Sequence, residues 1–305
     1  MPVRFTLVRV LDSRTVPDLN QPTSLAVDSQ GNLVLCDCPE GRPTVSRLLA
    51  QAGYHRQPVA DAGTFGAPPV LVRVGPRDAL YVGCFPQGGQ PCVRRISAAG
   101  QREQPYALPG IPADFAVDRE GKLWVIYRER SQGLSLQAYG PFGAPTYDYE
   151  AAVEEARDHE VAPPLFIDGQ YLTVAPDGDL WFGAVLEQTS CVRLAPDGRW
   201  RYWDYPSSFT DAHGFTDYCG LAAADATTLL TTDFRALDGG PAEQYLVEID
   251  LERRRFSWTS LADLGLPDMR EPAEPSIWDL AWRDGLLYLC DYTYHRIIIL
   301  RGDSS

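Results

Sequence analysis

The sequence predicts an all-β protein: a six-bladed β-propeller with four-stranded blades, whose N-terminal strand completes the last blade. Two observations lead to this fold. A hairpin pattern recurs six times along the chain, and the opening strand has no blade of its own. A third observation supports them, because only 150–160 (EAAVEEARDHE) has helix-forming composition over more than two turns.

The recurring unit is a short apolar strand, a tight polar turn, and a second apolar strand that carries aromatic side chains. This combination is typical of a β-hairpin. The copies are 24–37 (SLAVDSQGNLVLCD), 72–84, 115–127, 172–184, 220–233 and 279–291.

The spacing of the copies sets the size of each unit. Equivalent positions follow one another at intervals of 47, 43, 57, 49 and 59 residues, on average 51, at Val27, Val74, Val117, Val174, Ala223 and Trp282. About fifty residues hold the four short strands of one propeller blade. Blades are therefore expected at approximately 22–60, 68–108, 112–150, 168–206, 218–261 and 275–301.

The sixth blade runs out of chain after its third strand. Residues 4–11 (RFTLVRVL) alternate like a strand and belong to no other blade. We expect this segment to supply the outer strand of the sixth blade, which closes the ring. A closed ring cannot be cut into independently stable halves, so residues 1–305 are predicted to form one domain.

The repeats resemble NHL repeats. The segment 22–37 (PTSLAVDSQGNLVLCD) is similar to the consensus turn and strand of that family, and 290–300 (CDYTYHRIIIL) is similar to its repeat end, with Tyr294 where Asn is usual. The resemblance implies a propeller of the superfamily that contains gluconolactonase-type lactonases, strictosidine-synthase-like enzymes, lyases and protein-binding modules. A fold with so many activities does not choose among them.

Gluconolactonase-type relatives hold a divalent ion at the ring centre with a Glu, Asn and Asp set. This chain does not retain the set, because Thr23, Cys219 and Trp278 stand at the corresponding positions. Ca²⁺ prefers several oxygen ligands, and the calcium candidates are Asp114, Asp217 and Asp279. The interpretation we favour for these acids is a solvated rim, and no organic cofactor is expected.

Composition limits the partners and the compartment. There are 27 Lys and Arg against 41 Asp and Glu, a net charge of −14. Nucleic acid and anionic membranes require clustered positive charge, so neither is expected as a partner. The N-terminus lacks the features of a secretion signal, which predicts a cytoplasmic, acidic protein.

The seven cysteines are an odd number and favour reduced thiols over a disulfide framework. Cys84 and Cys92 flank the loop 85–91. We expect them to lie opposite each other on paired strands, near enough to bridge if oxidised.

Loop lengths predict the functional face. The turns between first and second strands, and between third and fourth strands, are tight and share one face, here called the turn face. The opposite, loop-rich face carries the long connections 57–69, 104–113, 151–170, 205–218 and 259–276. Long loops on a rigid scaffold are where binding and catalysis concentrate.

Two of these loops, 209–220 (FTDAHGFTDYCG) and 270–280 (REPAEPSIWDL), supply most candidate site residues. A carboxylate beside an imidazole tunes it as a general base, and aromatic side chains suit an apolar or cyclic ligand. The predicted catalytic residues are His213, Tyr218 and Asp279, and the predicted substrate-binding residues are Asp114, Phe215, Glu274 and Trp278. The alternatives are a plain hydrogen-bonding role for His213 and a core position for Trp278.

Two functions follow from this arrangement. The first is binding of a small organic molecule over the central channel on the loop-rich face, with acid/base chemistry of the lyase, hydrolase or cyclisation type. The alternative is a non-catalytic NHL-type scaffold that presents the same face to a partner protein. We favour the enzyme, because a ring without an appended domain has only its own face to present.

Overall fold

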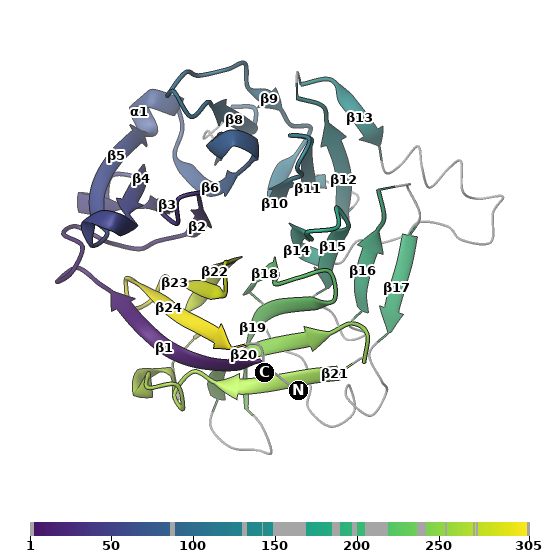
Figure 1. The fold of residues 1–305 in the computed structure, drawn as a ribbon. Coiled ribbons are helices and arrows are strands. Elements are labelled where there is room, and N and C mark those ends of the chain that lie inside the picture. Colours follow the sequence, from purple (N-terminus) through teal and green to yellow (C-terminus); the bar gives the residue numbers. More distant parts are fainter. Residues whose placement is uncertain are drawn as a thin grey trace.

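The computed structural model shows six four-stranded antiparallel sheets around a central axis (Figure 1). The structure describes residues 3–85, 89–129, 133–141, 143–148, 169–184, 190–196, 200–204, 219–236, 242–253, 255–270, 272 and 274–303. Within these residues the six-bladed β-propeller expected from the repeat is confirmed.

Strands follow one another outward from the axis in the first five blades. The first blade holds β2 (Ser24–Val27), β3 (Leu33–Asp37), β4 (Thr44–Leu49) and β5 (His55–Asp61). The second holds β6 (Pro69–Val74), β7 (Leu80–Cys84), β8 (Cys92–Ile96) and β9 (Tyr106–Ala107). The third holds β10 (Ile111–Val117), β11 (Leu123–Glu129), β12 (Gly133–Tyr139) and β13 (Pro145–Asp148).

The remaining blades follow the same order. The fourth holds β14 (Gly169–Val174), β15 (Leu180–Ala184), β16 (Ser190–Leu194) and β17 (Trp200–Asp204). The fifth holds β18 (Cys219–Ala223), β19 (Thr228–Ala236), β20 (Ala242–Asp250) and β21 (Arg255–Ser260). The sixth holds β22 (Ile277–Arg283), β23 (Leu286–Asp291) and β24 (Arg296–Asp303), with β1 (Arg4–Leu11) as its outer strand.

The N-terminal strand closes the ring as predicted. β1 pairs with β24 in antiparallel register, from Arg4 opposite Asp303 to Leu11 opposite Ile297. Both chain ends therefore lie close together at the sixth blade (Figure 1). Beyond the strand, the backbone N–H of Val3 donates to Glu248 Oε2 at 2.8 Å and ties the N-terminus to β20.

The turns on the turn face depend on the residues that mark the repeat. Asp28 Oδ1 accepts hydrogen bonds from the backbone N–H groups of Gln30 and Asn32, at 3.0 and 2.9 Å. Gly31 takes φ 78°, a left-handed conformation that favours glycine. An Asp at the first position of a turn holds the following amides in the same way wherever it recurs.

The core consists of apolar layers between neighbouring blades. The layer between the first two blades contains Val34, Val45, Val72 and Val82, each fully buried. Burying a side chain of this size contributes about 1.5–3 kcal/mol, so the layers hold the blades at fixed angles around the axis.

Helices are few and short in the described residues: α1 (Ala62–Phe65), η1 (Pro39–Gly41), η2 (Ala50–Ala52), η3 (Pro76–Asp78) and η4 (Pro267–Met269). In this described part of the chain, none has the length and apolar character to span a bilayer. The segment 150–160, with its helix-forming composition, lies outside the described residues.

Candidate functional site

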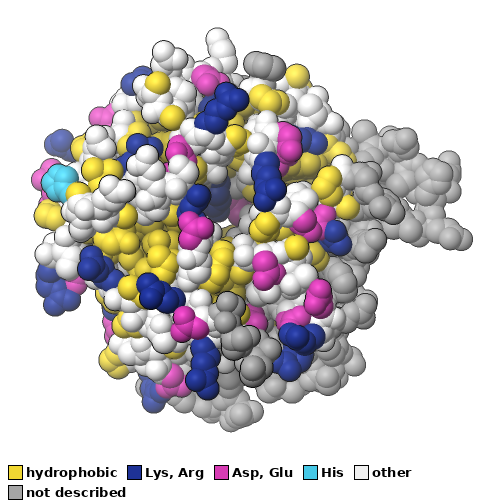
Figure 2. Space-filling view, in the orientation of Figure 1, with side chains coloured by type: hydrophobic (Ala, Val, Ile, Leu, Met, Phe, Trp, Pro, Cys, Tyr) yellow, Lys and Arg dark blue, Asp and Glu magenta, His cyan; other side chains and the backbone are white. Residues whose placement is uncertain are grey.

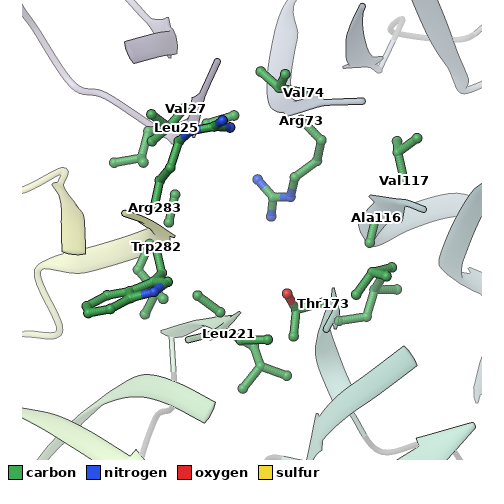
Figure 3. A pocket seen from close by; sticks show the side chains of 17 residues that line it. Leu25, Val27, Arg73, Val74, Ala116, Val117, Thr173, Leu221, Trp282 and Arg283 are labelled. Atoms are coloured by element: carbon green, nitrogen blue, oxygen red, sulfur yellow. The ribbon is translucent and has the colours of Figure 1, made fainter. Parts of the chain in front are cut away.

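The inner strands converge on the axis with one unusual side chain. At one equivalent position of the six inner strands, five blades carry a small residue and the second blade carries arginine. The six residues are Ala26, Arg73, Ala116, Thr173, Ala222 and Ala281. The five short side chains leave space around the axis, and the Arg73 guanidinium points into that space (Figure 3).

Arg73 binds two carboxylates from distant blades. Its Nη2 lies 2.8 Å from Asp114 Oδ1 on β10, and its Nη1 lies 2.7 Å from Asp279 Oδ2 on β22. Nη1 also donates to Ser24 Oγ at 3.0 Å and to the Val72 carbonyl at 2.9 Å. The two aspartates are 1% and 2% exposed, so they are not at a solvated rim, whereas the Arg73 side chain is 18% exposed at the cavity.

The same polar residues bind backbone amides at the inner edges of neighbouring blades. Asp279 Oδ2 accepts from the Leu25 N–H at 3.1 Å, and Asp114 Oδ2 accepts from the Leu172 N–H at 3.1 Å. Ser24 Oγ accepts from the Val72 N–H at 3.0 Å. Innermost strands have no further strand to pair with, and a buried backbone N–H without a partner is costly.

The cluster of Arg73, Asp114, Asp279 and Ser24 therefore links five of the six blades. We call it the axial cluster. Each aspartate also accepts from the N–H of the next residue, Phe115 at 2.8 Å and Leu280 at 2.9 Å. These bonds occupy both oxygens of each carboxylate, so the chain itself saturates them.

Burial and neighbouring charge shift the ionisation of the cluster. Burial raises the pKa of Asp114 to about 6, with Arg73 acting in the opposite direction and Asp279 adding to the rise. Burial alone would lower the pKa of Arg73, but Asp114 and Asp279 raise it above its usual value. The cluster therefore pairs one guanidinium with two buried acidic side chains.

The structure brings together two of the sequence-predicted residues, Asp114 and Asp279. It places a guanidinium between them, which the sequence analysis missed. The available signal was Arg73 itself, at a position where the other repeats carry Ala or Thr. No group of three or more His, Cys, Asp or Glu side chains suited to a metal occurs within the described residues.

Trp278 and Glu274 lie at the loop-rich end of β22. The Trp278 ring is 45% exposed and stacks on Tyr292, with ring centroids 4.0 Å apart and planes 16° apart. The Glu274 side chain is exposed. Of the two interpretations for Trp278, substrate binding and a core position, its exposure argues against the core.

Four predicted site residues, His213, Phe215, Asp217 and Tyr218, lie in 205–218, outside the described residues. Their roles stay predictions.

A cavity of about 200 Å³ lies on the axis, and a space-filling view along the axis shows a hollow at the ring centre (Figure 2). The C-terminal halves of all six inner strands line it, with Val27, Val74, Val117 and Val174 among the apolar residues. Arg73, Thr173 and Arg283 add polar groups (Figure 3).

This cavity lies toward the turn face, because the strand ends that line it lead into the tight turns. The sequence analysis placed the pocket at the opposite, loop-rich face, from loops that include 151–170 and 205–218. Those two loops lie almost wholly outside the described residues. Asp114 and Asp279 precede the residues of their own strands that line the cavity, so they lie nearer to the loop-rich face than those residues do.

No protein-family model matches the chain, and no curated protein matches it. Solved structures do. A protein of unknown function from Bacteroides thetaiotaomicron aligns over 99% of this chain and 77% of its own, with 11% identity and a TM-score of 0.65.

Two structures of described function match over nearly their whole length. Virginiamycin B lyase from Staphylococcus aureus aligns over 98% of this chain and 99% of its own, with 12% identity and a TM-score of 0.59. The PQQ-bound aldose sugar dehydrogenase from Streptomyces coelicolor aligns over 99% of each chain, with 14% identity and a TM-score of 0.58. At these identities the likeness shows the propeller fold alone.

Proposed function

We propose that the protein binds a small organic molecule in its central channel. The observation that carries the proposal is the axial cavity of about 200 Å³, lined by mostly apolar residues with Arg73, Thr173 and Arg283 as polar groups among them. Ligand sites are typically concave and mostly apolar, with a few placed polar groups. An enclosed cavity of about 150 Å³ is large enough for benzene, so the volume of this more open and more polar one corresponds to a ligand of about one ring.

The Nε–H group of Arg73 defines the polar part of the ligand. Both terminal nitrogens hold acceptors from the protein, whereas Nε has no acceptor among the described residues. A carbonyl, ether or hydroxyl oxygen of the ligand would accept a hydrogen bond from this Nε–H group. Asp114 and Asp279 already pair with the Arg73 guanidinium, so a neutral oxygen acceptor is the group that we expect at Nε.

The similar propellers support this use of the fold without identifying the ligand. A structure of inactive virginiamycin B lyase from Staphylococcus aureus contains quinupristin, and the Streptomyces coelicolor dehydrogenase contains PQQ. Both are organic ligands bound by a propeller.

Substitution of Thr173 tests the proposal, because its side chain faces the cavity (Figure 3). A panel of small neutral cyclic compounds is screened by ligand-observed NMR. Thr173→Phe fills the cavity and should weaken binding of any hit by about tenfold or more, equivalent to 1.4 kcal/mol. Thr173→Val keeps the volume and is the matched control. Absence of hits, or equal binding by Thr173→Phe, would contradict the proposal.

A second function is favoured by the exposed stack of Trp278 on Tyr292 at the loop-rich end of the channel. We propose acid/base chemistry on a ligand at that face, with His213 as the acid/base group and Trp278 as an aromatic wall. His213→Ala should abolish turnover without changing the unfolding midpoint, and retained turnover would remove the assignment. Capture of a partner protein that depends on Trp278 would favour the interaction scaffold instead.

A further inference from the structure

The second blade carries two cysteines that face each other across its central hairpin. Cys84 ends β7 and Cys92 begins β8, and they are direct partners in the antiparallel register. Opposite residues of such a pair have Cα atoms about 4.5–5.5 Å apart. Disulfides need Cα atoms about 4.4–6.8 Å apart, so the strands hold the pair at bonding distance without any backbone movement.

No other cysteine of the described strands has this relation. Cys36 lies opposite Ser24 and Val45, and Cys290 lies opposite Asp279 and Ile297. Cys191 and Cys219 are likewise paired with residues other than cysteine. The geometry is therefore specific to one pair.

The two thiols have different surroundings. Cys84 is fully buried in the apolar layer between the first two blades, whereas Cys92 is partly exposed. The neighbouring Cys84 thiol lowers the pKa of Cys92 to about 6, and nearby Arg94 acts in the same direction. The same interaction, together with burial, raises the pKa of Cys84. Cys92, the more exposed and more acidic thiol of the pair, is therefore the one that we expect to react first with an oxidant.

We propose that Cys84 and Cys92 form a redox modification site that a peroxide converts into a reversible disulfide. The Cys92 thiolate attacks one peroxide oxygen, the O–O bond breaks, and Cys92 becomes a sulfenic acid while hydroxide or alkoxide leaves. Cys84 then loses its proton and attacks the Cys92 sulfur, and the S–O bond breaks with release of water. Two electrons pass from the sulfurs to the peroxide, and a dithiol reverses the bond by exchange.

The bond would close the connection 85–91, which joins β7 to β8 on the loop-rich face. The strands already hold both ends of this loop. Oxidation therefore constrains one loop and leaves the blade in place.

Thiol mapping tests the proposal. The intact protein is treated with hydrogen peroxide and analysed by mass spectrometry. The free thiols should fall from seven by two, one cross-linked peptide should contain Cys84 and Cys92, and dithiothreitol should restore both thiols. Cys38→Ser, which removes another partly exposed cysteine, is the control and should behave like the unaltered protein.

Two variants separate the steps. Cys84→Ser should stop at a sulfenic acid on Cys92 that a dimedone reagent traps. Cys92→Ser should lose the fast oxidation phase and, because Cys92 is partly exposed, should fold normally. The rate of the fast phase should rise with a midpoint near pH 6. Cross-links between other cysteines, an unchanged fast phase in Cys92→Ser, or a midpoint near the ordinary thiol value of about 8.5 would overturn the proposal.

Discussion

Removal of the Arg73 charge should destabilise the ring strongly. Arg73→Met keeps most of the length and the apolar stem of the side chain, but it leaves Asp114 and Asp279 without their counter-ion, at 1% and 2% exposure. Breaking a buried ion pair by removing one partner costs about 3–5 kcal/mol. Because one guanidinium serves two carboxylates, we expect a loss near the upper end of that range.

The uncompensated charge is the physical cause, and a second substitution can show this. Asn at both positions 114 and 279 removes the charges and keeps oxygen acceptors for the Leu25 and Leu172 amides. Added to Arg73→Met, these changes should restore most of the lost stability. Arg253→Met is the control, because its partner Asp250 lies at the surface and the Arg253 side chain is 59% exposed; exposed pairs contribute about 0–1 kcal/mol.

The assay is urea unfolding at pH 7 followed by tryptophan fluorescence. A free energy of unfolding for Arg73→Met within about 1 kcal/mol of the unaltered protein would refute the structural role of the axial cluster. A triple variant as unstable as Arg73→Met would refute the charge explanation, because the charges would then be gone while the defect remained.

Two further predictions concern pH and ring closure. Folding raises the pKa of Asp114 from 3.8 to about 6, so the folded protein holds the proton on this side chain more tightly than the unfolded chain does. The resulting contribution to the free energy of unfolding is about 3 kcal/mol. It is complete below pH 3.8 and is lost as the pH rises through 6. Asp114→Asn should flatten that part of the pH dependence of the free energy of unfolding, and parallel curves for the two proteins would count against it. Deletion of residues 1–11 removes β1 and exposes the edge of β24, which should lower the urea midpoint and promote self-association in size-exclusion chromatography; a monomer with an unchanged midpoint would show that the strand is dispensable.

The blades could be predicted from sequence because their signals are local. Asp28 and Gly31 shape one turn within a few residues, and the unassigned strand 4–11 had only one incomplete blade to join. The axial cluster could not, because Arg73 lies 41 residues from Asp114 and 206 from Asp279 in the chain. Only the closed ring brings them together, and the sequence pattern marks acids and arginines without pairing them.

The axial cavity was not predicted from the sequence, for a related reason. Loop length pointed to the loop-rich face, but the space on the axis depends on small side chains such as Ala116 and Ala222. Alanine in an inner strand looks like ordinary core in the sequence. The space that these alanines leave on the axis becomes visible only when equivalent positions of all six inner strands are compared.

The most direct test of ligand binding in the channel is a crystal structure of the protein soaked with the best compound from the NMR screen. We predict electron density for the compound in the axial cavity, with an oxygen within hydrogen-bond distance of Arg73 Nε, and none in crystals of Thr173→Phe treated identically. Density for the compound only elsewhere, or equal density in both proteins, would contradict the account.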